Sequence, residues 1–393
     1  MPWKELNIVD ERRAFIAEWL KRKEGFGELC DTYGISRKTG YKWVQRFYDG
    51  GISGLLDRSR RPHRLVNKVS EEIEEVVVKA RERYPTWGPK KLKAWLAKQD
   101  PETRWPAEST IGALLKRRGL VLNRRKRTRT PHQTQPLAAA TEPNAVWTTD
   151  FKGAYRVAGK YCHPLTIADA HSRFLLKLHP LEGERFSLVQ PVFERVFREY
   201  GMPYRIRSDN GSPFASRQSV GGLSRLAVWW VRLGITPELI EPGHPEQNGR
   251  HERMHRTMKA EGVHPGRSRE GEQERLLEQF RVYYNEERPH EALGQRTPTE
   301  VYNHSPRTFP EDLPEPEYPR EFVLRRVQKE GHFTWNGCRT RVGKVLGGQE
   351  IGVEPISDGR WQVWFGPIYL GLIVDEGRRK SLFLKNDLKE NQE

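Results

Sequence analysis

Residues 241–259 read EPGHPEQNGRHERMHRTMK, a loop rich in proline and glycine that gives way to a charged helix. Glu252 lies in the first turns of that helix. At helical spacing Glu252, Arg256 and Lys259 fall at i, i+4 and i+7, so they share one face. One carboxylate beside two cations suggests an acid that holds a metal ion while its neighbours hold phosphate.

The same stretch also contains a zinc motif. His251, Glu252 and His255 stand at the spacing H-E-x-x-H, which is the signature of zinc metalloproteases. Such a site needs both histidines on one face of a helix packed in a core, together with a third ligand. The rest of the chain decides between the two interpretations.

The composition favours nucleic acid as a partner. The 393 residues carry 68 Lys and Arg against 52 Asp and Glu, a formal charge of +16, and this length allows about two to four domains. Cys30, Cys162 and Cys338 lie far apart, which indicates neither a zinc finger nor disulfides and fits a reduced, cytoplasmic and nucleoid-associated location. We see neither a secretory signal nor an apolar run of about 18 residues that would span a membrane.

Residues 1–50 predict a helix-turn-helix DNA-binding domain. Glycines separate three amphipathic helical segments, and Ser36 is placed to cap the third. A structural three-helix module without DNA contact is the alternative. The basic side chains that the last helix would present to the major groove favour DNA binding; the residues concerned are Arg37, Lys38, Thr39, Lys42 and Arg46.

A basic linker at 51–68 leads to a second predicted helix-turn-helix domain at 69–122. Pro89 suits the first turn of its middle helix, and Ser109 could cap its last helix. A second basic linker at 123–143 follows. A linker that tracks phosphates is favoured over a nuclear localisation signal or a solvated tail, and the basic residues from the end of the domain onward are Lys116, Arg117, Arg118, Arg124, Arg125, Lys126, Arg127 and Arg129.

Residues 144–308 predict an α/β core. Strand-like segments come first, and helices interleaved with further strands follow, as in a sheet covered by helices. We expect strands at 145–151, 161–168, 173–178, 204–207 and 235–237, and helices at 186–200, 223–233, from Gly249 onward and at 272–284.

Three acids stand out by their placement in this core. Asp150 lies in or at the end of the first strand, Asp209 follows a short strand, and Glu252 starts a helix. Sites gather at strand ends in open α/β sheets, so the fold could bring the three together. Clustered carboxylates demand a cation, and oxygen ligands favour Mg²⁺ or Mn²⁺, with two ions suited to displacement at phosphorus. Taken singly, each acid is more often a cap or a surface residue.

Two charged neighbours have open roles. Lys152 shares a strand face with Asp150, so it could contact phosphate or pair with an acid. Asp169 is followed by Ser172 and Arg173, which suggests a turn role for this fourth acid and no part in catalysis.

The end of the chain predicts a small all-β domain. Residues 309–320 are acidic and rich in proline, as in a spacer between domains. Over 321–385 apolar and polar residues alternate, and the pairs Asn336-Gly337 and Asp358-Gly359 signal hairpins. We expect a barrel of about five strands.

These stretches together resemble the integrase-like transposases of bacterial insertion sequences, relatives of retroviral integrase with a ribonuclease H-like core. The resemblance rests on residues 147–152, 208–214, 244–259 and 284–298, and the helix-turn-helix front and β end also fit. It implies an Asp-Asp-Glu triad of Asp150, Asp209 and Glu252. Asp209 and Glu252 have 42 residues between them, more than in the retroviral arrangement, and the retroviral His/Cys zinc module is not visible.

The resemblance implies a Mg²⁺-dependent DNA transposase that binds terminal inverted repeats, frees 3′ ends and joins them to target DNA as a homo-oligomer. Arg256 and Lys259 would contact DNA near the cleaved bond, with surface solvation as the alternative. We expect packing or DNA contact, and no zinc, for His251 and His255, because their helix is strongly cationic. A non-catalytic DNA-binding regulator and a zinc protease remain the rival functions.

Overall fold

The computed structural model describes residues 8–57, 69–121, 137–157, 159–216, 219–241, 244–261, 271–357, 359–375 and 380–383. The chain divides into two compact units, Met1–Val69 and Ser70–Glu393, and each is described by itself. Among the described residues, no helix is long and apolar enough to cross a membrane.

The first unit is the predicted three-helix arrangement. It contains α1 (Ile8–Lys21), α2 (Phe26–Thr32) and α3 (Arg37–Gly50), followed by the short helix η1 (Gly51–Leu55). The Ser36 hydroxyl accepts a hydrogen bond from the Thr39 amide at 3.2 Å, so Ser36 caps α3 as expected. Gly40 lets α3 approach α2, because a Cβ there would lie 2.6 Å from the Cys30 sulfur.

The second unit begins with another three-helix domain, formed by α4 (Glu71–Arg83), α5 (Pro89–Gln99) and α6 (Glu108–Arg117). Pro89 is the first residue of α5, as predicted, because its missing N–H costs nothing there. The cap predicted at Ser109 is wrong. Ala107 occupies the position before α6, and Ser109 already lies inside the first turn.

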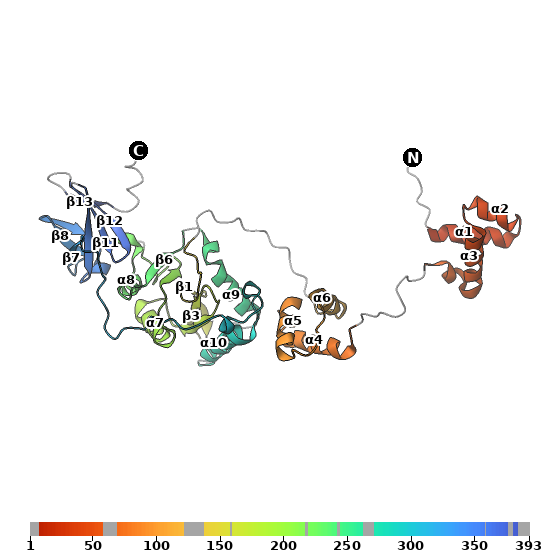
Figure 1. Ribbon diagram of the computed structural model, residues 1–393, viewed down its shortest axis with the longest axis horizontal. Coiled ribbons are helices and arrows are strands. Elements are labelled where there is room, and N and C mark those ends of the chain that lie inside the picture. The colour runs from red at the N-terminus through yellow and green to blue at the C-terminus, as the bar shows by residue number, and fades with distance from the viewer. Residues whose placement is uncertain are drawn as a thin grey trace. The chain divides into compact units, whose positions relative to one another are not determined.

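A mixed sheet forms the middle of the chain (Figure 1). Its strands run in the order β2-β3-β1-β5-β6, and β4 pairs with β3. β1 is antiparallel to β3 but parallel to β5, and β5 is parallel to β6. The sequence analysis missed β2, and the strands are β1 (Val146–Phe151), β2 (Tyr155–Val157), β3 (Lys160–Asp169), β4 (Leu175–Leu181), β5 (Arg205–Ser208) and β6 (Thr236–Leu239).

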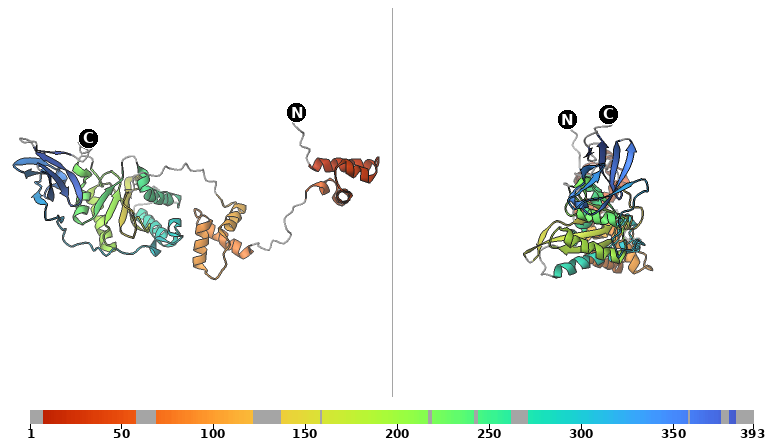
Figure 2. Two further views of the ribbon diagram at one scale, coloured as in Figure 1. Left: turned by 45° about the horizontal axis from the view of Figure 1, so that its top comes forward. Right: turned by 90° about the vertical axis from the view of Figure 1, so that its left-hand side faces the viewer.

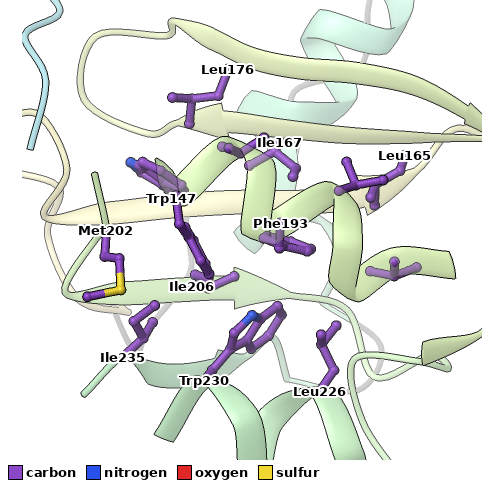
Figure 3. Packing of buried hydrophobic residues seen from close by; sticks show 14 of the residues in the cluster. Trp147, Leu165, Ile167, Leu176, Phe193, Met202, Ile206, Leu226, Trp230 and Ile235 are labelled. Carbon is purple, nitrogen blue, oxygen red and sulfur yellow. The ribbon is translucent and has the colours of Figure 1, made fainter. Parts of the chain in front are cut away.

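Helices cover both faces of this sheet. α7 (Phe186–Tyr200) and α8 (Arg225–Arg232) pack on one face, where Trp147, Ile206, Phe193 and Trp230 meet in the main core (Figure 3). On the other face, α9 (Gly249–Ala260) and α10 (Glu272–Val282) bury methionine and aromatic side chains against β3 and β4. α10 ends earlier than predicted, since Tyr283–Glu287 forms a π-helical turn.

The alternation of side chains along β1 decides which residues reach which layer. Trp147 is fully buried on the α7 and α8 side. Thr148 and Asp150 point to the opposite face, because successive strand residues alternate, and so they face α9. β1 thus serves the main core and the candidate site at the same time.

The end of the chain is all β, in two sheets. One has the strand order β13-β12-β11-β10-β7, and the other pairs β8 with β9 across Asn336 and Gly337, whose φ angles are 44° and 77°. The described strands number seven where about five were predicted, and their closure into a barrel stays a prediction. They are β7 (Val323–Arg326), β8 (His332–Trp335), β9 (Cys338–Arg341), β10 (Glu350–Ser357), β11 (Arg360–Phe365), β12 (Ile368–Asp375) and β13 (Lys380–Phe383).

α8 is shared between two hydrophobic cores. Trp230 and Leu226 belong to the main core of the mixed sheet. Val228 and Val231, on the other side of the helix, pack with β-domain residues, so the β domain lies against α8 (Figure 2). The Arg232 guanidinium adds hydrogen bonds of 2.8 and 2.9 Å to the carbonyls of Leu313 and Pro314 in the spacer.

Candidate active site

Asp150 lies at the carboxyl end of β1 with its side chain 22 % exposed. Burial, with smaller contributions from the negative charges of Asp209 and Glu252, raises the pKa of its carboxyl to about 7, while a hydrogen bond from the Phe151 amide and the charge of Lys152 act in the opposite direction. Two other acids therefore lie close enough to Asp150 to disfavour its ionisation.

Asp209 follows β5 directly. The parallel register pairs Thr148 with Arg207, so continuing it by two residues places Asp150 level with Asp209. The Gly211 amide donates to Asp209 Oδ1 at 3.0 Å, and a Cβ at Gly211 would lie 3.2 Å from both carboxylate oxygens. The side-chain amide of Asn210 donates to the Ile240 carbonyl at 2.6 Å, which ties the turn to the end of β6.

Glu252 comes from α9, on the layer that covers this end of β1. The helix is amphipathic: its buried face carries His251, Met254, His255 and Met258. Glu252, Arg256 and Lys259 are all exposed, as their helical spacing predicts. The three acids therefore come from two adjacent parallel strands and one covering helix.

The two histidines of the zinc motif are buried beneath Asp150. His251 Nδ1 lies 2.9 Å from the Thr148 hydroxyl, and His251 Nε2 contacts the hydroxyl of Thr166. His255 Nε2 lies 3.2 Å from the same Thr166 oxygen, and His255 Nδ1 lies 3.7 Å from Asp150 Oδ2. Both side chains are buried and pack under β1 and β3, which agrees with packing, one of the two roles expected from the sequence.

The hydrogen bonds of Thr166 assign the protons in this network. Its hydroxyl donates to the main-chain carbonyl of Asp150 at 2.8 Å, so it accepts from the Nε2–H groups of His251 and His255. Burial lowers the pKa of His255 to about 3 and that of His251 well below its usual value, so both rings are neutral. Neutral rings add no positive charge beside the three acids.

These residues fit a divalent cation. Within the described ranges, Asp150, His251 and His255 form a group whose possible ligand atoms all lie within 4.8 Å of one another, and this group does not include Asp209 or Glu252. Carboxylates that repel one another separate until a cation draws them in. The raised pKa of Asp150 is the electrostatic cost that such a cation would remove.

Lys152 and Asp169 are the two other charged residues whose roles the sequence left open or assigned to a turn. Lys152 lies close enough to Asp150 to oppose the rise in its pKa, which agrees with a place beside the acids. Asp169 is buried and accepts hydrogen bonds from the amides of Asn144 at 2.8 Å and Ser172 at 2.7 Å, so its turn role is confirmed.

The residues expected to bind DNA in the first unit differ in their exposure and in whether their side chains already contact other parts of the domain. Arg37, Lys38 and Lys42 are exposed on α3. Thr39 is half-buried and its hydroxyl lies 3.0 Å from that of Ser36. Arg46 donates to the Leu56 carbonyl at 2.8 Å and lies 4.7 Å from the Trp43 ring, so its guanidinium partly supports the fold.

The basic residues of the second helical domain and of the linker after it fall into two groups, those that the structure describes and those outside the described residues. Arg117 and Arg118 both reach the buried carboxylate of Glu74, at 2.5 and 3.2 Å. Their guanidinium groups are therefore held by the domain itself, and DNA contact stays a prediction for them. Arg124, Arg125, Lys126 and Arg127 lie outside the described residues.

Sequence analysis missed several residues around Glu252. Arg173, Arg250 and Arg253 line a hollow beside it, and Lys91 reaches the same hollow from α5. Arg250 precedes the zinc motif and Arg253 lies inside it, and the sequence marked them only as cations of the helix. Arg173 and Lys91 gave no local signal, since they are 82 residues apart in the chain and meet only through the fold.

Family comparisons match most parts of the chain. Two family models described as "integrase core domain" match residues 140–245 and 233–298. A helix-turn-helix domain matches 11–63, a homeodomain-like domain matches 39–115, and "IS481 family transposase, C-terminal domain" matches 323–375. The chain has the domains of an integrase-like insertion-sequence transposase. Its fold is accordingly helix-turn-helix at the front, ribonuclease H-like in the middle and all-β at the end.

Individual relatives agree with this family. The uncharacterized 39.2 kDa protein of insertion element IS476 from Xanthomonas euvesicatoria is 28 % identical over 46 % of this chain and 50 % of its own length. The uncharacterized 31.7 kDa protein of insertion element IS407 from Burkholderia multivorans is 30 % identical over 46 % of this chain and 63 % of its own. The chain thus spans 50 % of the length of the first curated relative and 63 % of the length of the second.

A solved structure is also similar. It is the simian T-cell lymphotropic virus intasome in complex with PP2A regulatory subunit B56 gamma, at 15 % identity over 73 % of this chain and 91 % of that chain. The TM-score of this match is 0.35.

Proposed function

We propose that this chain is a DNA transposase that binds the terminal inverted repeats of a mobile element, frees their 3′ ends and joins them to target DNA. One observation carries the proposal: Asp150 and Asp209 end two adjacent parallel strands, and Glu252 lies close enough to add to the raised pKa of Asp150. Asp150, Asp209 and Glu252 form the catalytic triad in this proposal.

The triad would hold the metal ions. Asp150, Asp209 and Glu252 would together hold two Mg²⁺ or Mn²⁺ ions. When bound, the ions supply activation of the attacking oxygen and stabilisation of the leaving oxygen in an in-line displacement at phosphorus. Lys152, Arg256 and Lys259 would hold the phosphates of the strand that is cut.

Two exchanges at phosphorus make up the reaction. In the first, water forms a P–O bond, the bond from phosphorus to the 3′ oxygen breaks, and that oxygen leaves with a proton. In the second, the free 3′ hydroxyl forms a bond to a target phosphorus, gives up its proton, and displaces a target 3′ oxygen. Two element ends must be joined together, so we expect a homo-oligomer to carry out the reaction.

The other parts would recognise DNA. In this proposal residues 1–50 and 69–122 are the helix-turn-helix domains that read the terminal repeats, and Arg37, Lys38 and Lys42 are the exposed cations of the first. The linkers at 51–68 and 123–143 would follow the phosphates. The segment 321–385, which follows the acidic spacer at 309–320, is a small β domain in this proposal.

A zinc protease is not favoured. Both ring nitrogens of His251 are engaged by threonine hydroxyls, which leaves neither free for zinc. Glu252 is exposed on α9 while the two histidines of the motif face inward. The other rival, a non-catalytic regulator, would have no use for the three acids at one end of the sheet.

Strand transfer tests the proposal. The inverted repeats that flank the gene would be made as a labelled duplex and incubated with the full chain, target plasmid and Mg²⁺. We expect Glu252→Gln to reduce joined product at least about a hundredfold, because losing one electrostatic stabiliser costs about 10²–10³ in rate. Glu194→Gln is the matched control and keeps activity, since Glu194 is a partly exposed acid of α7 that pairs with Arg198. Joining that survives Glu252→Gln would overturn the triad.

A further inference from the structure

A basic hollow of about 660 Å³ opens beside Glu252. Its walls come from α9, from the turn between β3 and β4, from the segment after α10, and from α5 of the second helical domain. Two carboxylates line it, those of Glu252 and Glu291. Against them stand six cationic side chains, those of Lys91, Arg173, Arg250, Arg253, Arg256 and Arg288.

The positive charge in this hollow is not neutralised from within. Glu291 pairs with Lys90 at 3.0 Å, so it is already engaged. Arg288 pairs with Glu261 at 2.7 Å, but among the residues that the structure describes no carboxylate pairs with Arg173, Arg253 or Arg256. Arg173 Nη1 is buried without a hydrogen-bond partner. A buried donor on a cation is costly to leave unsatisfied, which points to an anion that completes it.

The cations also repel one another. Burial first, and then the charge of Arg288, lowers the pKa of Lys91 to about 7. Burial and the neighbouring Arg250 lower the pKa of Arg173 to about 10. Both side chains are thus held where positive charge is unfavourable, and a bound oxyanion would relieve both.

The wall that carries Lys91 is fixed to the core by aromatic and polar contacts. The Trp87 ring stacks on Tyr84 at 3.9 Å, and its Nε1 donates to the Tyr283 hydroxyl at 2.7 Å. The Tyr84 hydroxyl donates to Glu287 at 2.8 Å. These contacts hold α5 against the segment after α10, so Lys91 and Arg173 form one site although they belong to different domains.

We propose that this hollow binds backbone phosphates of DNA, and that the second helical domain and the core build it jointly. The ligand chemistry is the phosphodiester oxyanion. The strand would pass from the hollow along α9, where Glu252, Arg256 and Lys259 are exposed next to each other. This inference deepens the proposed function and rests on it for the identity of the strand. The second helical domain then serves as one wall of the catalytic cleft.

The test is the salt dependence of DNA binding by the full chain in EDTA, with a fluorescent 30-base-pair duplex of arbitrary sequence as the probe. Each lost phosphate contact lowers the slope of log K against log salt by about 0.9. We expect this loss for Lys91→Met and for Arg253→Gln, which is exposed and therefore spares the fold. Lys98→Met is the matched control, since Lys98 lies on α5 but pairs with Glu300 outside the hollow. Unchanged slopes in both hollow variants would overturn the proposal.

A second measurement separates DNA from a small anion. Inorganic phosphate at millimolar concentration is added, and the melting temperature of the wild type is compared with that of Lys91→Met. A phosphate-induced rise that Lys91→Met abolishes, with the DNA slope unchanged, would make the hollow a small-anion site and sink the backbone assignment. Reduced slopes in the hollow variants, with little response to free phosphate, support it.

The two proposals can fail separately. The binding assay contains no divalent ion, so it does not depend on catalysis. If the wild type joins no DNA with Mg²⁺ while the hollow variants still lose slope, the transposase proposal fails and the phosphate site stands. If the wild type joins DNA and the hollow variants bind it with unchanged slopes, the phosphate site fails alone.

Discussion

At the scale of single residues, the candidate site is a competition between burial and charge. The negatively charged form of Asp150 is disfavoured because its carboxyl is largely buried and lies near Asp209 and Glu252. The two histidines beneath it are neutral and do not offset that charge. A cation bound at the proposed site would relieve this competition. Without one, the carboxyl group can relieve it by keeping its proton.

This makes stability depend on pH in a defined direction. The pKa of Asp150 is about 7 in the folded chain against 3.8 for an ordinary aspartate, so the folded state holds the proton more tightly. The stabilisation is present at low pH and is lost as the pH rises toward about 7. We expect Asp150→Asn in EDTA to melt progressively higher than the wild type between pH 5 and about 8. A constant difference in melting temperature across that range would contradict the raised pKa.

Some residue roles could be predicted from sequence and others could not. The positions of Asp150, Asp209 and Glu252 near the ends of strands or at the start of a helix could be predicted from the residues next to them in the sequence. The burial of His251 and His255 depends on Thr148 and Thr166, which face α9 only because β1 and β3 pair in one register. The sequence of α9 alone therefore left packing and DNA contact open for these two residues.

At the scale of elements, α8 shows most clearly what a linear pattern leaves out. Its sequence predicts a helix, and the helix is there. Because it is apolar nearly all round, one side fills the main core and the other receives the β domain. The pattern shows burial on both sides but not the identity of the partner.

A substitution on one side of α8 should release one partner only. Val231 is 3 % exposed and belongs to the β-domain core, and a Cβ at Gly366 would lie 2.8 Å from it. We expect Val231→Asp to destabilise the docked β domain by about 3–5 kcal/mol, the cost of a buried charge without a partner. Calorimetry should then show two transitions. Arg225→Asp, at the first residue of the helix, is the control, and a single unshifted transition in Val231→Asp would refute the shared role.

At the scale of the whole molecule, the net charge of +16 determines how strongly we expect the chain to be attracted to DNA. The sequence alone shows this, because charge adds up regardless of fold. The joining of the second helical domain to the core is different. It depends on Trp87 and Tyr283, which stand 196 positions apart, and neither gave a local signal of the other.

Binding of the intact chain to arbitrary duplex DNA should therefore be steeply salt dependent. A protein with six to ten phosphate contacts loses about 10³–10⁵ in affinity between 50 and 200 mM salt, because bound counterions are released. We expect at least about a thousandfold loss for the full chain, measured by fluorescence anisotropy at several salt concentrations. A loss below about tenfold would mean that the excess charge does not face DNA.

The two-sided burial of α8 also governs what happens to an incomplete chain. Without the β domain, Leu223, Ala227, Val228 and Val231 would form a bare apolar strip on the outside of the core. Strips of this kind drive association. We therefore expect a polypeptide that stops at the acidic spacer to self-associate through this strip.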